Sequence, residues 1–276
     1  MAERPPDHAS PTALITGASG GIGLELAKLF ARGGYNLVLV ARRGDPLEGV
    51  ASEVRALYGT SVHCLPIDLS VPEAPEKIFG MLRSRSLDVD VLVNNAGFGL
   101  YGNFQGSDPG ILLDMIRVNV SVPVHLANLL LPGMVRKGTG GVLNVASMAA
   151  FQPGPYMAVY YATKAFLLSF SEAVAEELRG TGVTVTALCP GPTPTGFQAA
   201  ARMEGHIPLL RKNVMDSGAV AKAGYDGFRK GKRLVIPGLR NRILVLAFRF
   251  SPRILLTKAV RWMQERRRPG GERRRG

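Results

Sequence analysis

The sequence predicts an α/β fold in which helices cover both faces of a doubly wound, mostly parallel sheet. Apolar strand-like runs alternate with helical stretches, the runs are rich in Val, Leu and Ile with little polar alternation, and a glycine cluster follows the first run. Strands that are buried on both faces lose polar alternation. Repeated strand–helix units favour a parallel sheet. The 276 residues, 46% of them hydrophobic, suffice for one sizeable domain.

Seven apolar runs are candidates for the strands of this sheet. A helical pattern from about Ile22 to Arg32 follows the first run, a second runs up to Tyr58, and a third extends from about Met157 to Arg179. The candidate strands are TALIT (12–16), NLVLV (36–40), VHCLPID (62–68), VDVLVNNAG (89–97), GVLNVAS (141–147), VTVTALCPG (183–191) and RLVIPG (233–238).

The net charge of +13 is concentrated at one end of the chain. Residues 229–276 carry 16 Lys/Arg and 2 Glu, a charge of +14, and the rest carries 18 Lys/Arg and 19 Asp/Glu, a charge of −1. Basicity therefore belongs to one segment. We divide the chain into a flexible N-terminal tail (1–10), one α/β domain (11–239), a basic amphipathic C-terminal appendage (240–267) and a disordered basic tail (268–276).

Cysteine usage and the chain ends indicate a cytoplasmic protein. Cys64 and Cys189 lie far apart and lack the spacing of a metal site, so we expect a reducing compartment, no disulfide framework and no bound metal. The polar, proline-bearing N-terminus has no apolar core of a signal peptide. The longest apolar run near the other end, Ile243 to Phe248, is too short to span a bilayer.

The glycine cluster TGASGGIG, from Thr16 to Gly23, is a candidate for binding a pyrophosphate. It stands where a strand ends and a helix begins. Glycines let the backbone approach a phosphate closely, and a helix N-terminus offers free N–H groups and a positive dipole. Glycines also serve ordinary turns, so the placement directly after the first strand is what favours a dinucleotide site.

The end of the second strand favours NADP over NAD. A site for NAD would want an acidic residue here to bind the ribose 2′-hydroxyl, but Ala41 is followed by Arg42 and Arg43. Two guanidinium groups suit a 2′-phosphate. The alternative is that both arginines are ordinary surface residues. Asp45 lies close enough in sequence to serve as the acidic residue of an NAD site, so NAD stays an alternative cofactor.

The stretch AVYYATKA holds two adjacent tyrosines before a lysine. Side chains four residues apart share one helix face, so Tyr160 and Lys164 would face the same way and Tyr161 would be turned off that face. An ammonium beside a phenol lowers the phenol pKa, which would make Tyr160 a usable proton donor near neutral pH. Taken alone, this spacing favours an ordinary pair on a helix surface.

Together these motifs resemble the short-chain dehydrogenase/reductase family over about Thr12 to Gly238, nearly the whole body. The resemblance implies a Rossmann fold, a nicotinamide cofactor and a catalytic set made of Asn119, Ser147, Tyr160 and Lys164. It also implies cofactor contacts from the glycine turn, the arginine pair, the PIDLS and NNAG loops, the catalytic helix and the PGPTPT loop: Gly17, Ser19, Gly21, Ile22, Gly23, Arg42, Arg43, Asp68, Leu69, Asn95, Ala96, Gly97, Tyr160, Lys164, Pro190, Gly191, Thr193 and Thr195.

The resemblance assigns each catalytic candidate a role. Ser147 would hydrogen-bond the substrate carbonyl oxygen and Tyr160 would donate the proton, while Lys164 would lower the Tyr160 pKa and grip the nicotinamide ribose. Asn119 would hold a water that relays protons. We therefore expect an NADP(H)-dependent oxidoreductase. The alternative is a catalytically silent NADP-binding sensor or scaffold, but such a protein would have no need of an intact Ser147, Tyr160 and Lys164.

The substrate is less visible in the sequence. Apolar residues beside Ser147 suit a lipophilic carbonyl or alcohol, although each is as consistent with an ordinary core position. In this family residues 203–211 would form a covering lid, and homo-oligomers, dimers or tetramers, are the expected assembly. The pocket candidates are Phe98, Met148, Phe151, Met157 and Phe197.

The C-terminal appendage mixes apolar residues with spaced cations. Pro252 should divide it into two short helices. One interpretation is a helix pair lying on an anionic membrane surface, with the basic side chains at the headgroups. The other is that its apolar face packs on the body or on a second subunit. A partnership with nucleic acid is disfavoured because no groove-reading motif is present.

Overall fold

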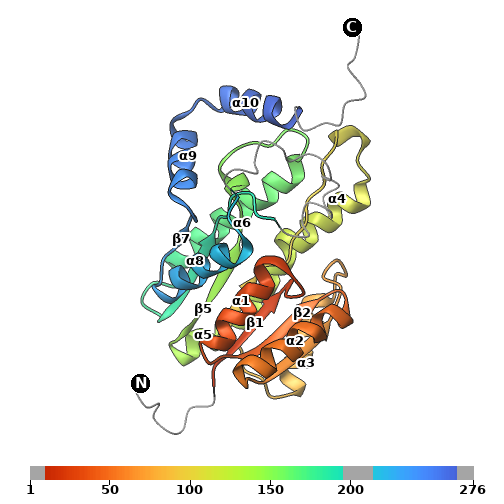
Figure 1. The fold of residues 1–276 in the computed structure, drawn as a ribbon, viewed down its shortest axis with the longest axis vertical. Coiled ribbons are helices and arrows are strands. Elements are labelled where there is room, and N and C mark those ends of the chain that lie inside the picture. Colours follow the sequence, from red (N-terminus) through yellow and green to blue (C-terminus); the bar gives the residue numbers. More distant parts are fainter. Residues whose placement is uncertain (1–9, 195–213, 266–276) are drawn as a thin grey trace.

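The protein forms a seven-stranded sheet with helices on both faces, in strand order β3-β2-β1-β4-β5-β6-β7 (Figure 1). The computed structural model describes residues 10–194 and 214–265. Every neighbouring pair of strands is parallel, so the predicted fold class is confirmed. The strands are β1 (Thr12–Thr16), β2 (Asn36–Ala41), β3 (Val62–Pro66), β4 (Val91–Asn94), β5 (Gly140–Val145), β6 (Val183–Leu188) and β7 (Leu234–Val235).

Helices follow the strands in a regular alternation. Buried residues of α1, α2 and α8 pack on one face of the sheet, and those of α3 and α5 pack on the other, together with part of α6. The helices are α1 (Gly21–Arg32), α2 (Gly44–Tyr58), α3 (Ala74–Ser84), α4 (Pro109–Ile116), α5 (Val122–Lys137), α6 (Ala158–Glu177), α8 (Ser217–Arg229), α9 (Leu239–Phe250) and α10 (Arg253–Glu265), with a π-helical turn η2 (Arg117–Ser121) and 3-10 turns η1 (Phe104–Gly106) and η3 (Met148–Phe151).

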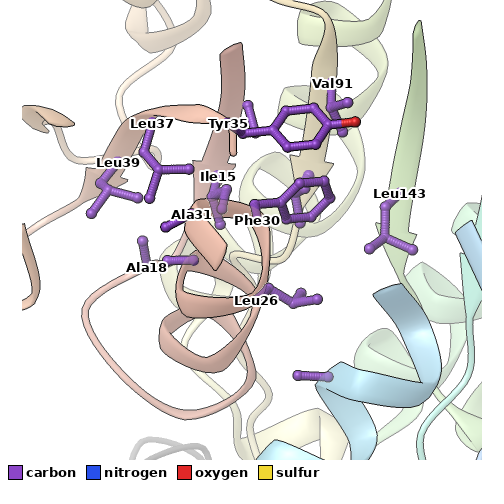
Figure 2. Packing of buried hydrophobic residues seen from close by; sticks show 14 of the residues in the cluster. Ile15, Ala18, Leu26, Phe30, Ala31, Tyr35, Leu37, Leu39, Val91 and Leu143 are labelled. Atoms are coloured by element: carbon purple, nitrogen blue, oxygen red, sulfur yellow. The ribbon is translucent and has the colours of Figure 1, made fainter. Parts of the chain in front are cut away.

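One apolar core lies between the sheet and the α1 layer. The rings of Phe30 and Tyr35 meet edge to face, with centroids 5.2 Å apart, in the same cluster as the fully buried Ile15 of β1 (Figure 2). Phe30 also contacts Tyr225 of α8 edge to face. Aromatic pairs in this geometry contribute about 0.5–1.5 kcal/mol beyond the area they bury. This packing holds the C-terminal part of α1, which ends at Arg32, against the sheet and α8.

The strand order places β1 at a topological switch point. The chain leaves β1 toward β2 on one side, and β4 pairs with β1 on the other. In open α/β sheets a crevice forms at such a point, outside the carboxyl ends of the strands, and ligands bind there. The loops that follow β1, β4, β5 and β6 therefore define where the site lies.

Several strands are shorter than their apolar runs. The run 62–68 is a strand only as far as Pro66, and the run 89–97 only over Val91–Asn94. In both cases the residues that follow the strand lie at the carboxyl edge of the sheet and include candidate site residues. The strand expected over 233–238 is reduced to Leu234–Val235.

The longest apolar helical segment, residues 109–137, joins α4, η2 and α5. It is the one helix in the described residues with the length and composition to cross a membrane, and 44% of its most apolar stretch is buried. Its buried residues, among them Val122, Leu126 and Met134, pack with Leu92 and Val142 of the sheet. Packing on the sheet accounts for its apolar character.

Candidate active site

The glycine turn leaves the N-terminus of α1 open. Gly17 and Gly21 have φ values of 66° and 56°, in the left-handed region that favours glycine. Gly20 caps α1 without a side-chain hydrogen bond, and the first turn has no acidic residue. The free N–H groups and the positive end of the helix dipole therefore face the crevice uncompensated by an acidic side chain. Ser19 and Ile22 stand on the same turn, partly buried.

The NNAG loop after β4 is fastened to the glycine turn. Asn95 Nδ2 donates to the carbonyl oxygens of Thr16 and Gly17, at 2.9 and 3.0 Å. Thr16 Oγ1 in turn accepts from the backbone N–H groups of Asn95 and Ala96, both at 3.0 Å. A Cβ on Gly23 would lie 2.3 Å from the Gly17 carbonyl oxygen, so only glycine fits there. The turn is thus held rigid before any ligand binds.

Two arginines lie at the carboxyl end of β2. Arg42 and Arg43 are exposed, and neither forms an ion pair within the part of the chain that the structure describes. Asp45, in the first turn of α2, is exposed as well. After β3, Asp68 Oδ1 accepts hydrogen bonds from the backbone and hydroxyl of Ser70, both at 2.9 Å, beside the buried Leu69.

Ser147, Tyr160 and Lys164 come together at the carboxyl edge of β5. Ser147 follows β5, and its Oγ accepts from the Ala149 N–H at 3.1 Å as the N-cap of η3. Lys164 Nζ lies 5.9 Å from the centre of the Tyr160 ring and donates to the Val145 carbonyl at 2.9 Å. The two α6 side chains therefore share one face of the helix, as their spacing predicts.

Burial sets the protonation of this group. It raises the pKa of Tyr160 to about 12, although a hydrogen bond with Ser147 acts in the opposite direction. Burial also lowers the pKa of Lys164 to about 8. The net shift of the Tyr160 pKa is therefore opposite to the expected lowering, because burial is the largest effect. Removing the phenolate from water outweighs an ammonium that is itself desolvated and bonded to Val145.

Asn119 lies on the π-helical turn between α4 and α5 and is fully buried. Its Oδ1 accepts from the Phe98 N–H at 3.1 Å, and its Nδ2 donates to the Phe98 carbonyl at 2.9 Å and to Thr163 Oγ1 at 3.1 Å. A Cβ on Gly97 would lie 3.1 Å from Asn119 Oδ1 and 3.3 Å from Lys164 Nζ. The Asn119 side chain thus ties the loop after β4 to α6.

The loop after β6 closes the other side of the site. The Pro190 carbonyl accepts from the Met148 N–H at 2.8 Å, and Thr193 is buried with its Oγ1 donating to the Gly191 carbonyl at 3.1 Å. Gly191 abuts the Asn241 side chain of α9. Thr195, Phe197 and the expected lid at 203–211 lie outside the described residues, as do most of the two terminal tails.

Helix α10 packs beside the site through three tyrosines. The Tyr101 hydroxyl donates to the Gln264 carbonyl at 2.7 Å, and the Tyr156 hydroxyl donates to Glu265 Oε1 at 2.6 Å. Gln264 Nε2 donates to the Tyr161 hydroxyl at 3.1 Å. Tyr156 has a φ of 66°, a left-handed conformation that is strained for a tyrosine. Part of the C-terminal appendage therefore packs on the body, and Tyr161 faces it.

Sequence reasoning missed two supporting residues, Thr16 and Thr163. Both are buried and use their hydroxyl groups to hold candidate site residues. The sequence offered a signal for each of them. Thr16 stands directly before the glycine turn, and Thr163 stands directly before the candidate Lys164. The expected pocket is described in part: Met157 is buried against Tyr101, Tyr160 and Tyr161 and borders a small hollow that also includes Leu100 and Leu112.

The fold is of the Rossmann type, and the candidate site lies at the carboxyl edge of its parallel sheet. A family profile for short chain dehydrogenases matches residues 11–205, well over half of the chain. The chain therefore belongs to the short-chain dehydrogenase/reductase family, whose members act on small molecules, and the resemblance seen in the motifs is confirmed.

Individual relatives agree with this assignment. A short chain dehydrogenase of Pseudocercospora fijiensis is 34% identical over 206 residues, which cover 73% of this chain and 66% of that protein. A very-long-chain 3-oxoacyl-CoA reductase of Laccaria bicolor is 38% identical over 177 residues, which cover 63% of this chain and 52% of that protein. The chain thus spans between half and two thirds of the lengths of these two relatives.

The likeness extends to the three-dimensional structure. A short-chain dehydrogenase from Sphingobium yanoikuyae in complex with NADPH superimposes with a TM-score of 0.78 and 32% sequence identity. The alignment covers 96% of this chain and 100% of that one. Its coverage includes more of this chain than the family profile does.

Proposed function

We propose that the protein is an NADP(H)-dependent reductase that interconverts the carbonyl and the secondary alcohol of a lipophilic small molecule. The observation that carries this proposal is the meeting of Ser147, Tyr160 and Lys164 at one edge of the sheet, next to an open helix N-terminus. Ser147 caps the turn η3 after β5, whereas Tyr160 and Lys164 lie on α6. Their arrangement offers a hydrogen-bond donor for an oxygen, a proton source and a cation at one edge of the sheet.

The side chains divide the work of carbonyl reduction. The hydride that reduces the carbonyl carbon is supplied by the nicotinamide cofactor when it is bound. The Ser147 hydroxyl orients the carbonyl oxygen, and the Tyr160 phenol gives it the proton that completes the alcohol. A pKa of about 12 keeps Tyr160 protonated at neutral pH, which is the form that reduction requires. The reverse reaction needs the phenolate and is therefore favoured by alkaline pH.

Lys164 and Asn119 hold this arrangement in place. The Lys164 ammonium donates to the Val145 carbonyl, and it would contact the cofactor ribose and stabilise a developing phenolate. The Asn119 side chain braces Phe98 and Thr163. The Asn119 side chain already makes three hydrogen bonds. We therefore propose that the backbone of Asn119, and not its side chain, holds the water that relays protons.

The proposal of NADP as the cofactor rests on the residues at the carboxyl end of β2. Arg42 and Arg43 are exposed cations without an internal ion pair in the described residues, and they follow β2 where a 2′-phosphate would be recognised. The NADPH complex of the Sphingobium relative supports the same choice. The glycine turn, Asp68 and the NNAG loop would hold the rest of the cofactor, since the open α1 N-terminus suits its pyrophosphate.

A lipophilic substrate is supported by the apolar surroundings and by the relatives. Met157 and Met148 are buried close to Tyr160 and Ser147. The Laccaria relative is named for an acyl-CoA substrate with a very long chain.

A catalytically silent NADP-binding protein is the alternative, and the complete Ser147, Tyr160 and Lys164 group argues against it. As in other members of the family, we expect a homo-oligomer and a cytoplasmic location.

The decisive experiment is a screen of NADPH oxidation over ketones, aldehydes and 3-oxoacyl thioesters of increasing chain length. We expect turnover that increases with the apolar surface of the substrate. Tight NADPH binding with no turnover of any substrate class would favour the silent cofactor-binding alternative. Preference for NADH over NADPH would overturn the cofactor assignment while leaving the reaction class intact.

A further inference from the structure

Helix α9 presents an apolar stripe that no described part of the chain covers. None of its residues is buried. Leu239, Ile243, Leu246 and Phe250, spaced to lie on one helix face, are exposed by 71%, 58%, 58% and 80%. Single exposed apolar residues are ordinary in soluble proteins, but a contiguous stripe marks an interaction surface.

Helix α10 also carries exposed apolar side chains, while its inner face packs on the body. Leu256, Val260 and Gln264 recur every four residues and are buried. The opposite side carries Leu255 and Trp262, exposed by 60% and 55%. Figure 1 shows α9 and α10, in blue, at the periphery of the molecule on either side of a bend.

Cations are interleaved with these apolar residues. In residues 239–265 the acidic residue is Glu265, which pairs with Arg261 at 2.8 Å. On α9, Arg242 and Arg249 lie on one flank of the apolar stripe and Arg240 on the other, as their spacing requires. All the cations of the two helices are exposed: Arg240, Arg242, Arg249, Arg253, Lys258 and Arg261.

Charge decides which occupant this surface fits. A second copy that covered it about a two-fold axis would bring two identical sets of cations together, because such an interface uses the same patch twice. Like charges across an interface oppose association. An anionic bilayer offers headgroups for the cations and an acyl boundary for the leucines and aromatic residues. We propose that α9 and α10 dock the protein on an anionic lipid membrane.

Docking there would bring lipid close to the active site. The inner face of α10 hydrogen-bonds Tyr101 and Tyr161, and Met157 packs between these tyrosines and Tyr160. A helix with its side chains is about 10 Å across, so a membrane on the outer face of α10 would lie about that far from these tyrosines. A lipophilic substrate then has a short path from the bilayer to the site.

Flotation of the full chain with lipid vesicles tests the proposal. Vesicles of phosphatidylcholine alone are compared with vesicles that contain phosphatidylglycerol, at about 0.05 M and about 0.5 M salt. We expect binding to the anionic vesicles that weakens at high salt without disappearing, since the apolar contacts are not screened. Binding to neutral vesicles should be much weaker. A full chain that ignores anionic vesicles at low salt overturns the proposal.

Two pairs of variants locate the docking surface. Ile243→Ser with Leu246→Ser on α9 should weaken anionic-vesicle binding at least about tenfold, because both side chains would leave the lipid boundary. The matched control is Leu57→Ser with Leu113→Ser, which changes leucines that are 61% and 58% exposed elsewhere on the body. The control should bind like the natural chain. Equal losses in both double variants would overturn the proposal.

Charge reversal gives an independent readout. Arg249→Glu with Arg253→Glu should weaken the salt-sensitive part of the binding, whereas Arg83→Glu with Arg85→Glu, at the C-terminal end of α3, makes the same change in net charge on another surface and should not. Because all four arginines are exposed, the thermal midpoints should match that of the natural chain. A different result would assign the surface to an interface between copies of the chain. In that case the natural chain does not bind vesicles, and Ile243→Ser with Leu246→Ser converts a dimer to a monomer in sedimentation, so the membrane assignment is wrong.

Discussion

The side-chain amide of Gln264 donates a hydrogen bond to the hydroxyl of Tyr161, 3.1 Å away, and so joins the C-terminal helix to the helix that carries Tyr160. The two adjacent tyrosines are thereby separated in role. Tyr160 interacts with Ser147 and lies beside Lys164, whereas Tyr161 faces α10. A rotation of one residue along the helix is enough to place one phenol in the site and the next in a packing contact.

Replacing each tyrosine by phenylalanine should separate these roles. Tyr160→Phe removes the proton donor, and we expect turnover to fall by about 10²–10⁴-fold with NADPH affinity nearly unchanged. Tyr161→Phe removes one hydrogen bond to Gln264, so turnover should persist with a stability loss of about 1 kcal/mol. Steady-state kinetics and urea unfolding of both variants make the comparison. An inactive Tyr161→Phe beside an active Tyr160→Phe would reverse the assignment.

Arg42→Ala should discriminate between the two cofactors. A charge-assisted hydrogen bond to a phosphate contributes about 1.5–3 kcal/mol, so NADPH affinity should fall at least about tenfold while NADH affinity changes little. Fluorescence titration with each cofactor measures the effect. Arg83→Ala, an exposed arginine on α3, is the control and should leave both affinities unchanged. An equal loss for NADH and NADPH would mean that Arg42 does not recognise the 2′-phosphate.

The fold was predictable because its signals are local. Each buried strand is an apolar run, and the glycine turn stands directly between β1 and α1. The contact between Tyr161 and Gln264 was not predictable, because it joins residues 103 positions apart through packing that no local pattern encodes. The sequence therefore could not decide whether the C-terminal appendage binds a membrane or packs on protein. The structure shows that α10 packs on the body with one face and leaves the other face exposed.

The candidate site divides in the same way. The spacing of Tyr160 and Lys164 correctly predicted a shared helix face. The expected direction of the Tyr160 pKa shift was wrong. The spacing predicts a neighbouring lysine, but it does not predict how far burial removes water from both side chains. The Asn119 side-chain contacts were likewise hidden, since they depend on the π-helical turn that aims this residue at Phe98 and Thr163.

Lys164→Met should stabilise the protein without cofactor while abolishing its turnover. Burial lowers the Lys164 pKa from 10.5 to about 8, so keeping this ammonium charged at pH 7 costs the folded state on the order of 3 kcal/mol. Loss of the hydrogen bond to the Val145 carbonyl offsets about 1 kcal/mol of the gain. Urea unfolding at pH 7 should therefore show a variant that is more stable by about 2 kcal/mol.

The same lysine predicts how stability depends on pH. Between pH 8 and 10.5 the unfolded chain binds a proton at Lys164 that the folded chain has lost, so this group makes the free energy of unfolding rise with pH in this window. Burial raises the pKa values of Cys64 and Cys189 from 9 to about 12 and that of Tyr160 from 10 to about 12, so these three groups oppose the rise from about pH 9 upward. The difference in free energy of unfolding between the natural chain and Lys164→Met, measured from pH 8 to pH 10, should therefore shift with pH in favour of the natural chain. A difference that stays constant would assign the pH dependence to other groups.

Gly23→Ala tests whether the glycine turn is rigid because of its own packing. A Cβ at Gly23 would lie 2.3 Å from the Gly17 carbonyl oxygen and 2.4 Å from Asn95 Nδ2, so the turn must shift and the hydrogen bonds of Asn95 must weaken. Overpacking of this kind costs about 1–3 kcal/mol. We expect that loss in urea unfolding without cofactor, together with weaker NADPH binding in a fluorescence titration.

Gly49→Ala supplies the matched control for the glycine turn. Gly49 lies within α2, and a Cβ there would meet nothing within 4 Å. Alanine in an open helical position stabilises by about 0.5–1 kcal/mol relative to glycine, so this variant should be more stable and bind NADPH normally. If Gly23→Ala proves as stable as Gly49→Ala, the turn can adapt to a side chain. Its role in cofactor binding would then rest on close approach to the phosphates and not on contact with Asn95.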